Sequence, residues 1–195
     1  DVILIKKIQS KKHIISFNGK FSKNINKKNT ISKLLKVLEK KKLLTSHKFE
    51  IKVNKYIPSK SGLGGGSMNA ANILKYLIKK NFINPSKSQL SSICNSVGSD
   101  VVLGLNSTFT ILKSNNQIKE FKNCKKFYAL IVKPGFGCST KEIFSGVKKF
   151  TKPRFNKSSK KILSFDNLKK LNNSLEVISL SKFPKLKNIK HFLEK

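Results

Sequence analysis

Glycines cluster in the first half of the 195-residue chain, in the run Pro58-Ser-Lys-Ser-Gly-Leu-Gly-Gly-Gly-Ser67. Residues without side-chain bulk let several backbone N–H groups converge on phosphate oxygens. A helix that begins directly after such a loop adds the positive end of its dipole. The run therefore predicts a phosphate-binding loop made of Pro58, Gly62, Leu63, Gly64, Gly65, Gly66 and Ser67.

Two widespread phosphate-binding motifs do not match this loop. No Gly-Lys-Ser/Thr closes it, as a Walker A loop requires, and its glycine spacing is not G-x-G-x-x-G. A glycine cluster can also be a flexible turn without a binding role. Here the cluster lies between a strand pattern and a helix pattern, and this placement favours phosphate binding.

Asp100 is the second candidate for chemistry. The chain has nine acidic residues, and Asp100 follows the break Val97-Gly-Ser99 and precedes an apolar run. A carboxylate can accept the proton of a hydroxyl that is being phosphorylated. A helix or turn cap is the alternative role for an Asp at such a break.

The elements that must position these residues follow from hydrophobic periodicity. Apolar residues recur at helical spacing over 29–44, with Asn29 as a possible N-cap, and again after Ser67, which we expect to be the N-cap of the next helix. Alternation over 47–56 predicts a half-buried strand that leads into the loop. Further strands are expected at 2–5 and 13–17, and a short helix at 86–96.

The second half of the chain has weaker patterns. Strands are expected at 107–112 and 127–132, a helix at 139–149, and mostly helix over 163–194 with a break at Pro184. Residues 148–161 form a basic, polar linker. This mixed order of strands and helices indicates an α+β protein.

A formal net charge of +33 raises the possibility of nucleic-acid binding. Of the 42 basic residues only Arg154 is arginine, and arginine is preferred for bidentate contacts to phosphate and guanine. We therefore favour biased residue usage and do not expect nucleic-acid binding. The three cysteines are widely spaced and form no C-x-x-C, so we expect reduced thiols and a cytoplasmic protein. No apolar run is long enough to span a membrane, so none is expected to do so.

The segment Lys55-Tyr-Ile-Pro-Ser-Lys-Ser-Gly-Leu-Gly-Gly-Gly-Ser-Met-Asn-Ala-Ala71 resembles the central motif of the GHMP kinase superfamily. Its triple glycine with Asn69 is most similar to the family of 4-diphosphocytidyl-2-C-methyl-D-erythritol kinases, in the non-mevalonate isoprenoid pathway. Three later segments are also similar to this family: 97–101 (Val-Gly-Ser-Asp-Val), 133–144 (Lys-Pro-Gly…Ser-Thr-Lys-Glu-Ile-Phe) and 172–184 (Asn-Asn-Ser-Leu-Glu…Phe-Pro).

The resemblance implies roles for individual residues. It implies that Asp100 is the catalytic base, that Lys55 and Asn29 contact ATP together with the loop, and that Thr140 and Phe144 contact the cytidine diphosphate substrate. Lys55 could instead be a surface lysine, Asn29 only a helix cap, and Phe144 a core residue. Mg²⁺ is expected with ATP, although no protein ligand for it can be named. Met68 stands where the family usually has serine, and Val102 where it has proline.

The resemblance also implies a two-lobed fold, with an N-terminal lobe like domain 2 of ribosomal protein S5 over 1–122 and a ferredoxin-like C-terminal lobe over 123–195. The family's opening Ala-Lys-Ile-Asn-Leu strand, its Gly-Tyr-His segment and its C-terminal Gly-Thr-Gly-Ala loop have no match. Both ends look cut, so we expect an incomplete piece that is inactive alone. A homoserine or mevalonate kinase remains an alternative, and the oligomeric state is open.

Overall fold

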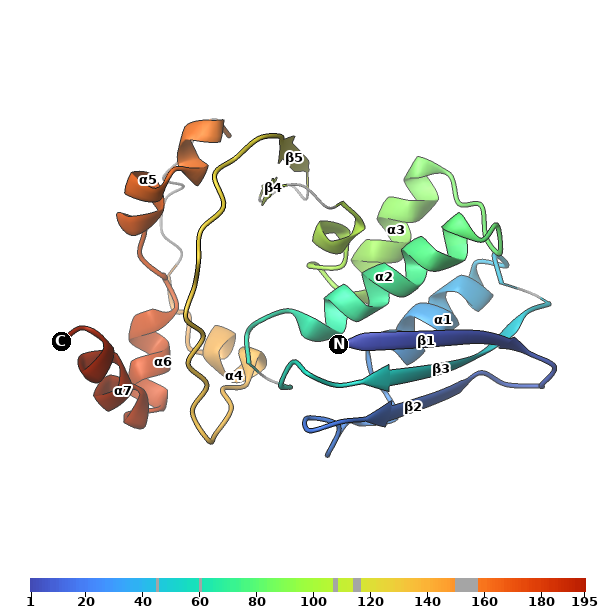
Figure 1. The fold of residues 1–195 in the computed structure, drawn as a ribbon, viewed down its shortest axis with the longest axis horizontal. Helices are drawn as coiled ribbons and strands as arrows, with labels where there is room; N and C mark the ends of the chain where they lie inside the picture. The colour runs from blue at the N-terminus through green and yellow to red at the C-terminus, as the bar shows by residue number, and fades with distance from the viewer. Residues whose placement is uncertain (45, 60, 107–108, 114–116, 150–157) are drawn as a thin grey trace. The chain divides into compact units, whose positions relative to one another are not determined.

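The computed structural model describes residues 1–44, 46–59, 61–106, 109–113, 117–149 and 158–195. They divide into two compact units, each of which is described by itself. The first unit comprises Asp1–Ser59 and Leu63–Ile118, and the second comprises Lys60–Gly62 and Lys119–Lys195. Helices and strands are mixed along the chain (Figure 1), as expected for an α+β protein.

A three-stranded sheet forms one layer of the first unit. Its strands are Val2–Ile8 (β1), Ile14–Asn18 (β2) and Lys48–Asn54 (β3), in the order β1-β3-β2. The central strand β3 pairs antiparallel with β1 and parallel with β2. All three were predicted from their alternating or β-branched sequences, and β3 alternates between buried and less buried positions along its length.

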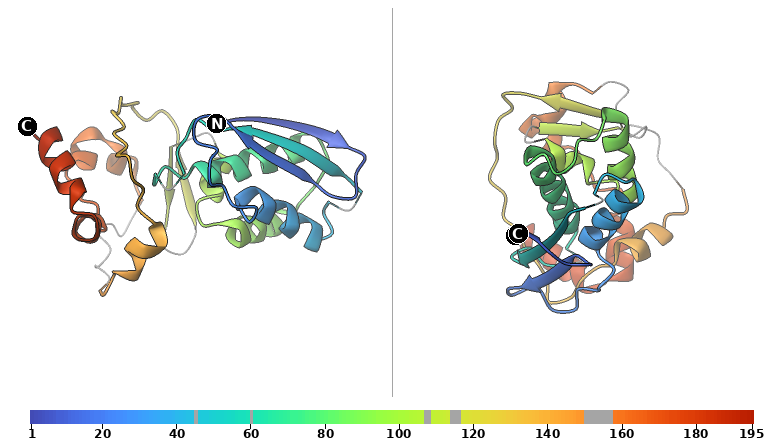
Figure 2. Two further views of the ribbon diagram at one scale, coloured as in Figure 1. Left: turned by 90° about the horizontal axis from the view of Figure 1, so that it is seen from below. Right: turned by 90° about the vertical axis from the view of Figure 1, so that its right-hand side faces the viewer.

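Three helices form the other layer, on one face of this sheet (Figures 1 and 2): Thr30–Lys40 (α1), Gly65–Lys79 (α2) and Lys87–Val97 (α3). Their apolar faces meet β3 in a single core, whose largest buried side chains include Phe49, Ile51, Leu34 and Leu74. The helical spacing predicted for α1 and α2 and the alternation predicted for β3 are therefore confirmed. The opposite face of the sheet leaves Leu4 and Ile14 exposed.

Helix α1 is shorter than its sequence pattern predicts. The apolar spacing continues to Leu44, but the helix ends at Lys40. Lys42 takes a left-handed backbone conformation with φ of 56°, and the Leu43 N–H returns to the Leu38 carbonyl over 3.0 Å. This reversal ends the helix while Leu44 still enters the core.

A 3₁₀ helix, Val102–Leu105 (η1), follows α3 and packs on α2. Phe109–Leu112 (β4) and Ile118–Phe121 (β5) then form a two-stranded sheet, of which only β4 was predicted. The remaining elements are Thr140–Ser145 (α4), Lys160–Leu163 (η2), Phe165–Lys169 (α5), Glu176–Lys182 (α6) and Lys185–Leu193 (α7). Pro184 is the N-cap of α7, so the predicted helical break at this residue is confirmed.

Two predictions for the second half were wrong. Residues 127–132 form no strand, and Tyr128, Leu130 and Ile131 are exposed. Strand-like composition is not sufficient without a neighbouring strand to pair with. Helix α4 ends at Ser145 and not at residue 149. Of the predicted linker 148–161, residues 150–157 lie outside the described part of the chain.

Within the described ranges, no helix is long and apolar enough to cross a membrane.

Candidate active site

The glycine cluster leads directly into α2, the longest helix of the first unit. Gly64 is the N-cap, with a left-handed φ of 65°, and Gly62 has a φ of 75°. The first intrahelical bond runs from the Met68 N–H to the Gly64 carbonyl over 2.9 Å. The N–H groups of Gly65, Gly66 and Ser67 therefore precede the helix's own hydrogen-bond ladder and lie at the positive end of its dipole.

Ser67 is not the N-cap, which corrects the sequence prediction. The left-handed turn at Gly64 starts the helix three residues earlier, so Ser67 occupies the first turn. A serine side chain is favoured at an N-cap because it can accept a backbone hydrogen bond. Here glycine takes that position because the backbone conformation excludes most side chains, and no side chain caps the helix.

The four glycines of the loop serve two purposes. A Cβ on Gly62 or Gly64 would meet nothing within 4 Å. These two positions therefore need glycine for the left-handed backbone conformation and not for close packing. A Cβ on Gly65 would approach Ile57 Cγ2 to 2.9 Å, and one on Gly66 would approach Thr30 Oγ1 to 3.0 Å. These two residues allow the start of α2 to pack closely on its neighbours.

The first helix is also tied to the loop. Thr30 donates its hydroxyl hydrogen to the Gly66 carbonyl over 2.9 Å. Asn29 precedes it as the N-cap of α1, and its Oδ1 accepts from the N–H groups of Ile31 and Ser32, each over 3.0 Å. The capping role of Asn29 is confirmed, and its contact to ATP stays a prediction.

Lys55 lies between β3 and the loop and is buried, with 5% of its surface exposed. It is therefore not the solvated surface lysine that formed the alternative. Its Nζ pairs with the carboxylate of Asp1, whose side chain is completely buried. Burial lowers the pKa of Lys55, while the adjacent carboxylate favours its charged form. An ATP contact by Lys55 stays a prediction.

Sequence analysis did not identify Asp1 as a functional residue. Besides Lys55, its carboxylate accepts from the backbone N–H groups of Tyr56 and Ile57, over 2.9 and 2.8 Å, and from the Asn69 side-chain amide over 2.7 Å. The only signal in the sequence is an acidic residue at the start of an apolar strand. The antiparallel register, which pairs Val2 with Asn54, is what places Asp1 beside Lys55.

Asp100 lies on the segment between α3 and η1, and its carboxylate is exposed. Ser99 donates its hydroxyl hydrogen to Asp100 Oδ1 over 3.1 Å. The adjacent Val101 is completely buried and anchors the segment in the core. The Asp100 carbonyl accepts from the Leu103 N–H over 3.2 Å at the start of η1, so the backbone of Asp100 takes part in a turn while its carboxylate stays exposed.

The Asp100 segment passes beside the first turn of α2. A Cβ on Gly98 would lie 3.8 Å from Ser67 Oγ, and one on Gly104 would lie 3.0 Å from the sulfur of Met68. Contacts on both sides of Asp100 therefore run to two successive residues of α2. The structure thus brings the candidate base and the start of the phosphate helix together within one unit.

Met68 has a packing role at this junction. Its sulfur and methyl group would stand 3.0 and 3.1 Å from a Cβ on Gly104, and the Ala71 Cβ would stand only 2.6 Å away. The thioether therefore occupies room that the missing side chain of Gly104 leaves. This accounts for an apolar residue at a position where serine was expected.

The other predicted positions are less constrained. Leu63, between Gly62 and Gly64, is 44% exposed. Pro58 is half-buried where the chain leaves β3. Phe144 on α4 is 56% exposed, which argues against the alternative of a core residue. Thr140 begins α4, but its side chain lies outside the described part of the structure. Both α4 residues belong to the second unit, and their substrate contacts stay predictions.

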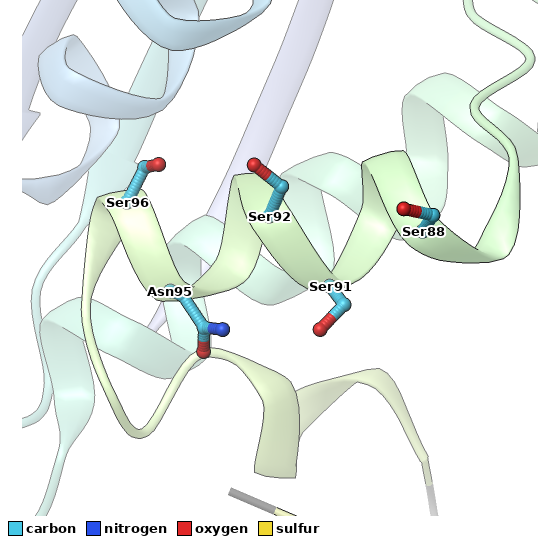
Figure 3. Close-up of a pocket in the computed structure, with 5 residues that line it drawn as sticks. All are labelled: Ser88, Ser91, Ser92, Asn95 and Ser96. Carbon is cyan, nitrogen blue, oxygen red and sulfur yellow. The ribbon is translucent and has the colours of Figure 1, made fainter.

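An open hollow of about 610 Å³ lies elsewhere, along α3. Its lining is polar and consists of Ser88, Ser91, Ser92, Asn95 and Ser96. Figure 3 shows Ser92 and Ser96 pointing to one side of the helix and Ser91 and Asn95 to the other. Lys41 donates to Ser92 Oγ over 3.0 Å, so part of this face is already occupied by the chain itself. Neither a loop residue nor a carboxylate is among the described residues that line this hollow, so it is not the candidate site.

The chain is similar in sequence to known kinases. Residues 29–112 match the model of the GHMP kinases N terminal domain. A 4-diphosphocytidyl-2-C-methyl-D-erythritol kinase from Pelagibacter ubique (strain HTCC1062) is 53% identical over 193 residues, which cover 99% of this chain and 69% of the relative. The enzyme of the same name from Clostridium botulinum (strain Hall) is 33% identical over 155 residues, covering 74% of this chain and 54% of the relative.

One solved structure has a similar fold. It is described as the crystal structure of 4-(cytidine 5'-diphospho)-2C-methyl-D-erythritol kinase, with a TM-score of 0.62 and 19% sequence identity. The match covers 96% of this chain and 66% of that one. The chain thus spans roughly two thirds of the Pelagibacter relative and of the solved structure, and about half of the Clostridium relative.

Proposed function

The chain belongs to the family of 4-diphosphocytidyl-2-C-methyl-D-erythritol kinases, within the GHMP kinases, and we propose that the protein containing it uses ATP to phosphorylate the 2-hydroxyl of that cytidine diphosphate sugar alcohol. The reaction class is phosphoryl transfer from ATP to an alcohol, in the non-mevalonate isoprenoid pathway. The fold is the α+β GHMP kinase fold. The observation that carries the proposal is the Asp100 segment lying against the first turn of α2.

The start of α2 has the features of an ATP phosphate site. Three consecutive N–H groups, from Gly65 to Ser67, precede the first hydrogen bond of the helix, and the two left-handed glycines face open space. Phosphate oxygens are suitable acceptors for such groups because they carry negative charge to the positive end of the helix dipole. The close packing of Gly65 on Ile57 and Gly66 on Thr30 holds these donors in fixed positions.

Asp100 is proposed as the base. Its carboxylate is exposed, so an alcohol can reach it, and Ser99 donates a hydrogen bond to Oδ1 and so restricts its orientation. It would accept the proton of the substrate hydroxyl as the new bond to phosphorus forms. The buried Val101 and the close approach of Gly98 and Gly104 to α2 support this proposal, because they hold the segment that carries Asp100 against the phosphate helix.

Mg²⁺ is proposed as a companion of ATP, because a divalent cation neutralises the charge that spreads over the phosphates during transfer. Among the described residues, no three His, Cys, Asp or Glu side chains gather as a metal cluster. Mg²⁺ in kinase sites is commonly held by phosphate oxygens with one or two protein groups. The half-buried Ser67 hydroxyl, in the first turn of α2, is the protein group that we assign to it.

We also propose a cytoplasmic location. The three cysteines are free, and free thiols are typical of proteins in a reducing compartment.

The test is an assay of the full-length protein with ATP and three alcohols in parallel: the cytidine diphosphate methylerythritol, homoserine and mevalonate. Only the first should be phosphorylated, and Asp100→Asn should lower its kcat by about 10²- to 10⁴-fold while the circular dichroism spectrum is unchanged. Phosphorylation of another alcohol would keep the kinase and reject the substrate. A fully active Asp100→Asn would reject the base. RNA binding with a steep salt dependence, without kinase activity, would support the nucleic-acid alternative.

A further inference from the structure

We propose that Asp1 is a positioning residue for the phosphate loop, because its single carboxylate holds the chain on both sides of that loop. This proposal rests on the assignment of the loop to ATP. Its four contacts are made to Lys55, Tyr56 and Ile57 before the loop and to Asn69 after it. No other acidic side chain of the described residues is completely buried.

On the entry side, Asp1 fixes the backbone that leaves β3. Oδ1 accepts from the Tyr56 and Ile57 N–H groups over 2.9 and 2.8 Å. Ile57 in turn is the side chain on which Gly65 packs, since a Cβ at Gly65 would lie 2.9 Å from Ile57 Cγ2. A shift of Ile57 would therefore be transmitted to the first residue of α2.

On the exit side, Asp1 reaches the helix directly. Asn69 lies in the second turn of α2, is 6% exposed and donates its side-chain amide to Oδ2 over 2.7 Å. The N–H donors at Gly65–Ser67 lie between these two attachments. Because both ends are bound to one rigid group, the donors are positioned before a phosphate arrives, which lowers the cost of ordering them on binding.

The charge of Asp1 matches this role. Its carboxylate is completely buried and receives the Lys55 ammonium and three N–H groups, so it is both paired and hydrogen-bonded. A buried hydrogen-bond network of this kind is rigid when every member is satisfied. Replacing the carboxylate by an amide leaves the volume unchanged but presents N–H groups to donors and leaves the Lys55 charge unpaired.

The experiment compares Asp1→Asn with wild type in the full-length protein. Dissociation constants are measured for ATP, ADP, AMP and adenosine without any alcohol present, so the result does not depend on the identity of the phosphorylated substrate. Loss of loop positioning should raise the dissociation constants of ATP and ADP by about 10- to 100-fold. The dissociation constant of AMP should rise less, and that of adenosine by under about 3-fold. A merely structural role would reduce the fraction of active protein and would affect all four nucleotides equally.

Glu39→Gln is the matched control. Glu39 also pairs with a lysine, Lys48, in the first unit but has no contact to the loop. Glu39→Gln should lower the free energy of unfolding. It should not weaken ATP or ADP binding more than AMP or adenosine binding. If Asp1→Asn does not fold, Asn69→Ala keeps the Asp1–Lys55 pair and releases only the exit side, with a smaller phosphate-dependent loss expected. Unchanged ATP affinity in the folded Asp1→Asn, or in Asn69→Ala, would overturn the proposal.

Discussion

The Asn69 side-chain amide donates to the Asp1 carboxylate over 2.7 Å, although 68 positions separate the two residues in the sequence. The contact joins the start of β1 to the second turn of α2. Lys55, at the end of β3, binds the same carboxylate oxygen. The sheet layer and the helix layer of the first unit therefore meet in one polar cluster, and two of its members, Lys55 and Asn69, precede and follow the glycine-rich loop in the sequence.

The left-handed N-cap of α2 gives the first prediction. Gly64→Ala should lower the free energy of unfolding by about 1–2 kcal/mol, because a φ of 65° is strained for alanine. A Cβ there would meet nothing within 4 Å, so the effect would come from conformation and not from a clash. ATP affinity should fall with it, as measured by calorimetric titration of the full-length protein.

Gly135→Ala is the control for this substitution. Gly135 also faces open space, but its φ lies outside the left-handed region. It should change neither stability nor ATP affinity. Equal effects of the two substitutions would show that the conformation of Gly64 is not what matters.

The contact between α2 and η1 gives the second prediction. Gly104→Ala should destabilise the protein by about 1–3 kcal/mol through overpacking, since its Cβ would lie 2.6 Å from Ala71 Cβ and 3.0 Å from the Met68 sulfur. It should also lower kcat, because η1 begins two residues after Asp100. Urea unfolding and steady-state kinetics provide the two measurements.

Gly98→Ala tests the same segment at a position where an added Cβ would meet its neighbours at normal contact distances. Its Cβ would meet Ser67 Oγ and Val101 Cγ2 at 3.8 Å, which is normal van der Waals contact. We expect a change in the free energy of unfolding within about 0.5 kcal/mol. A larger loss at Gly98 than at Gly104 would contradict the packing argument.

His13 gives a pH prediction. Burial holds the pKa of His13 below its usual value of 6.5, against the opposing influence of Glu39, while Lys48 also lowers it. Between that lowered pKa and 6.5 the unfolded state binds more protons, so the free energy of unfolding should rise with pH through this window and fall as pH drops below about 6.5. One proton limits the slope to about 1.4 kcal/mol per pH unit.

His13→Asn should flatten this slope. The asparagine oxygen can replace Nδ1 as acceptor for the Phe49 N–H, which lies 3.0 Å from it. The pKa of Glu39 is lowered by the Lys48 hydrogen bond, so its own contribution is lost at lower pH, below about 4.5. Urea unfolding from pH 5 to 7.5 is the measurement, and an unchanged slope in the variant would exclude His13 as its source.

The cysteines give a prediction about reactivity. Burial raises the pKa of Cys94 to about 11. At pH 8 only about one thiol in a thousand is then ionised, and the thiolate is the reactive form. Cys124 and Cys138 are half-buried and should react first with a maleimide. Mass spectrometry of native and urea-unfolded protein should find Cys94 modified only after unfolding, and early labelling of Cys94 would contradict its burial.

Sequence periodicity was sufficient for the elements that build the core. The alternation of β3 and the helical spacing of α1, α2 and α3 each have a local physical cause, and the Asn29 cap has a local side-chain signature. The N-cap of α2 was wrongly assigned to Ser67, because the helix begins at a left-handed glycine, Gly64, although serine is a good capping residue. Residues 127–132 were misassigned because strand formation depends on a partner that local sequence does not reveal.

The candidate site was only partly predictable for the same reason. The loop and Asp100 carry local motifs, and the structure places both segments together. Asp1 carries none, since its role depends on an antiparallel register and on a helix far along the chain. The packing of Met68 on Gly104 likewise depends on a pair of positions that no spacing rule links.

The pairing of β1 with β3 also has a consequence for the time course of folding. Contacts between residues distant in sequence form late, because closing a long stretch of chain costs entropy before any interaction is gained. The register Ile5–Ile51 and the Asp1–Asn69 bond are both of this kind. During refolding, helical content should therefore recover before the capacity to bind nucleotide, and ATP binding would mark the completion of the first unit.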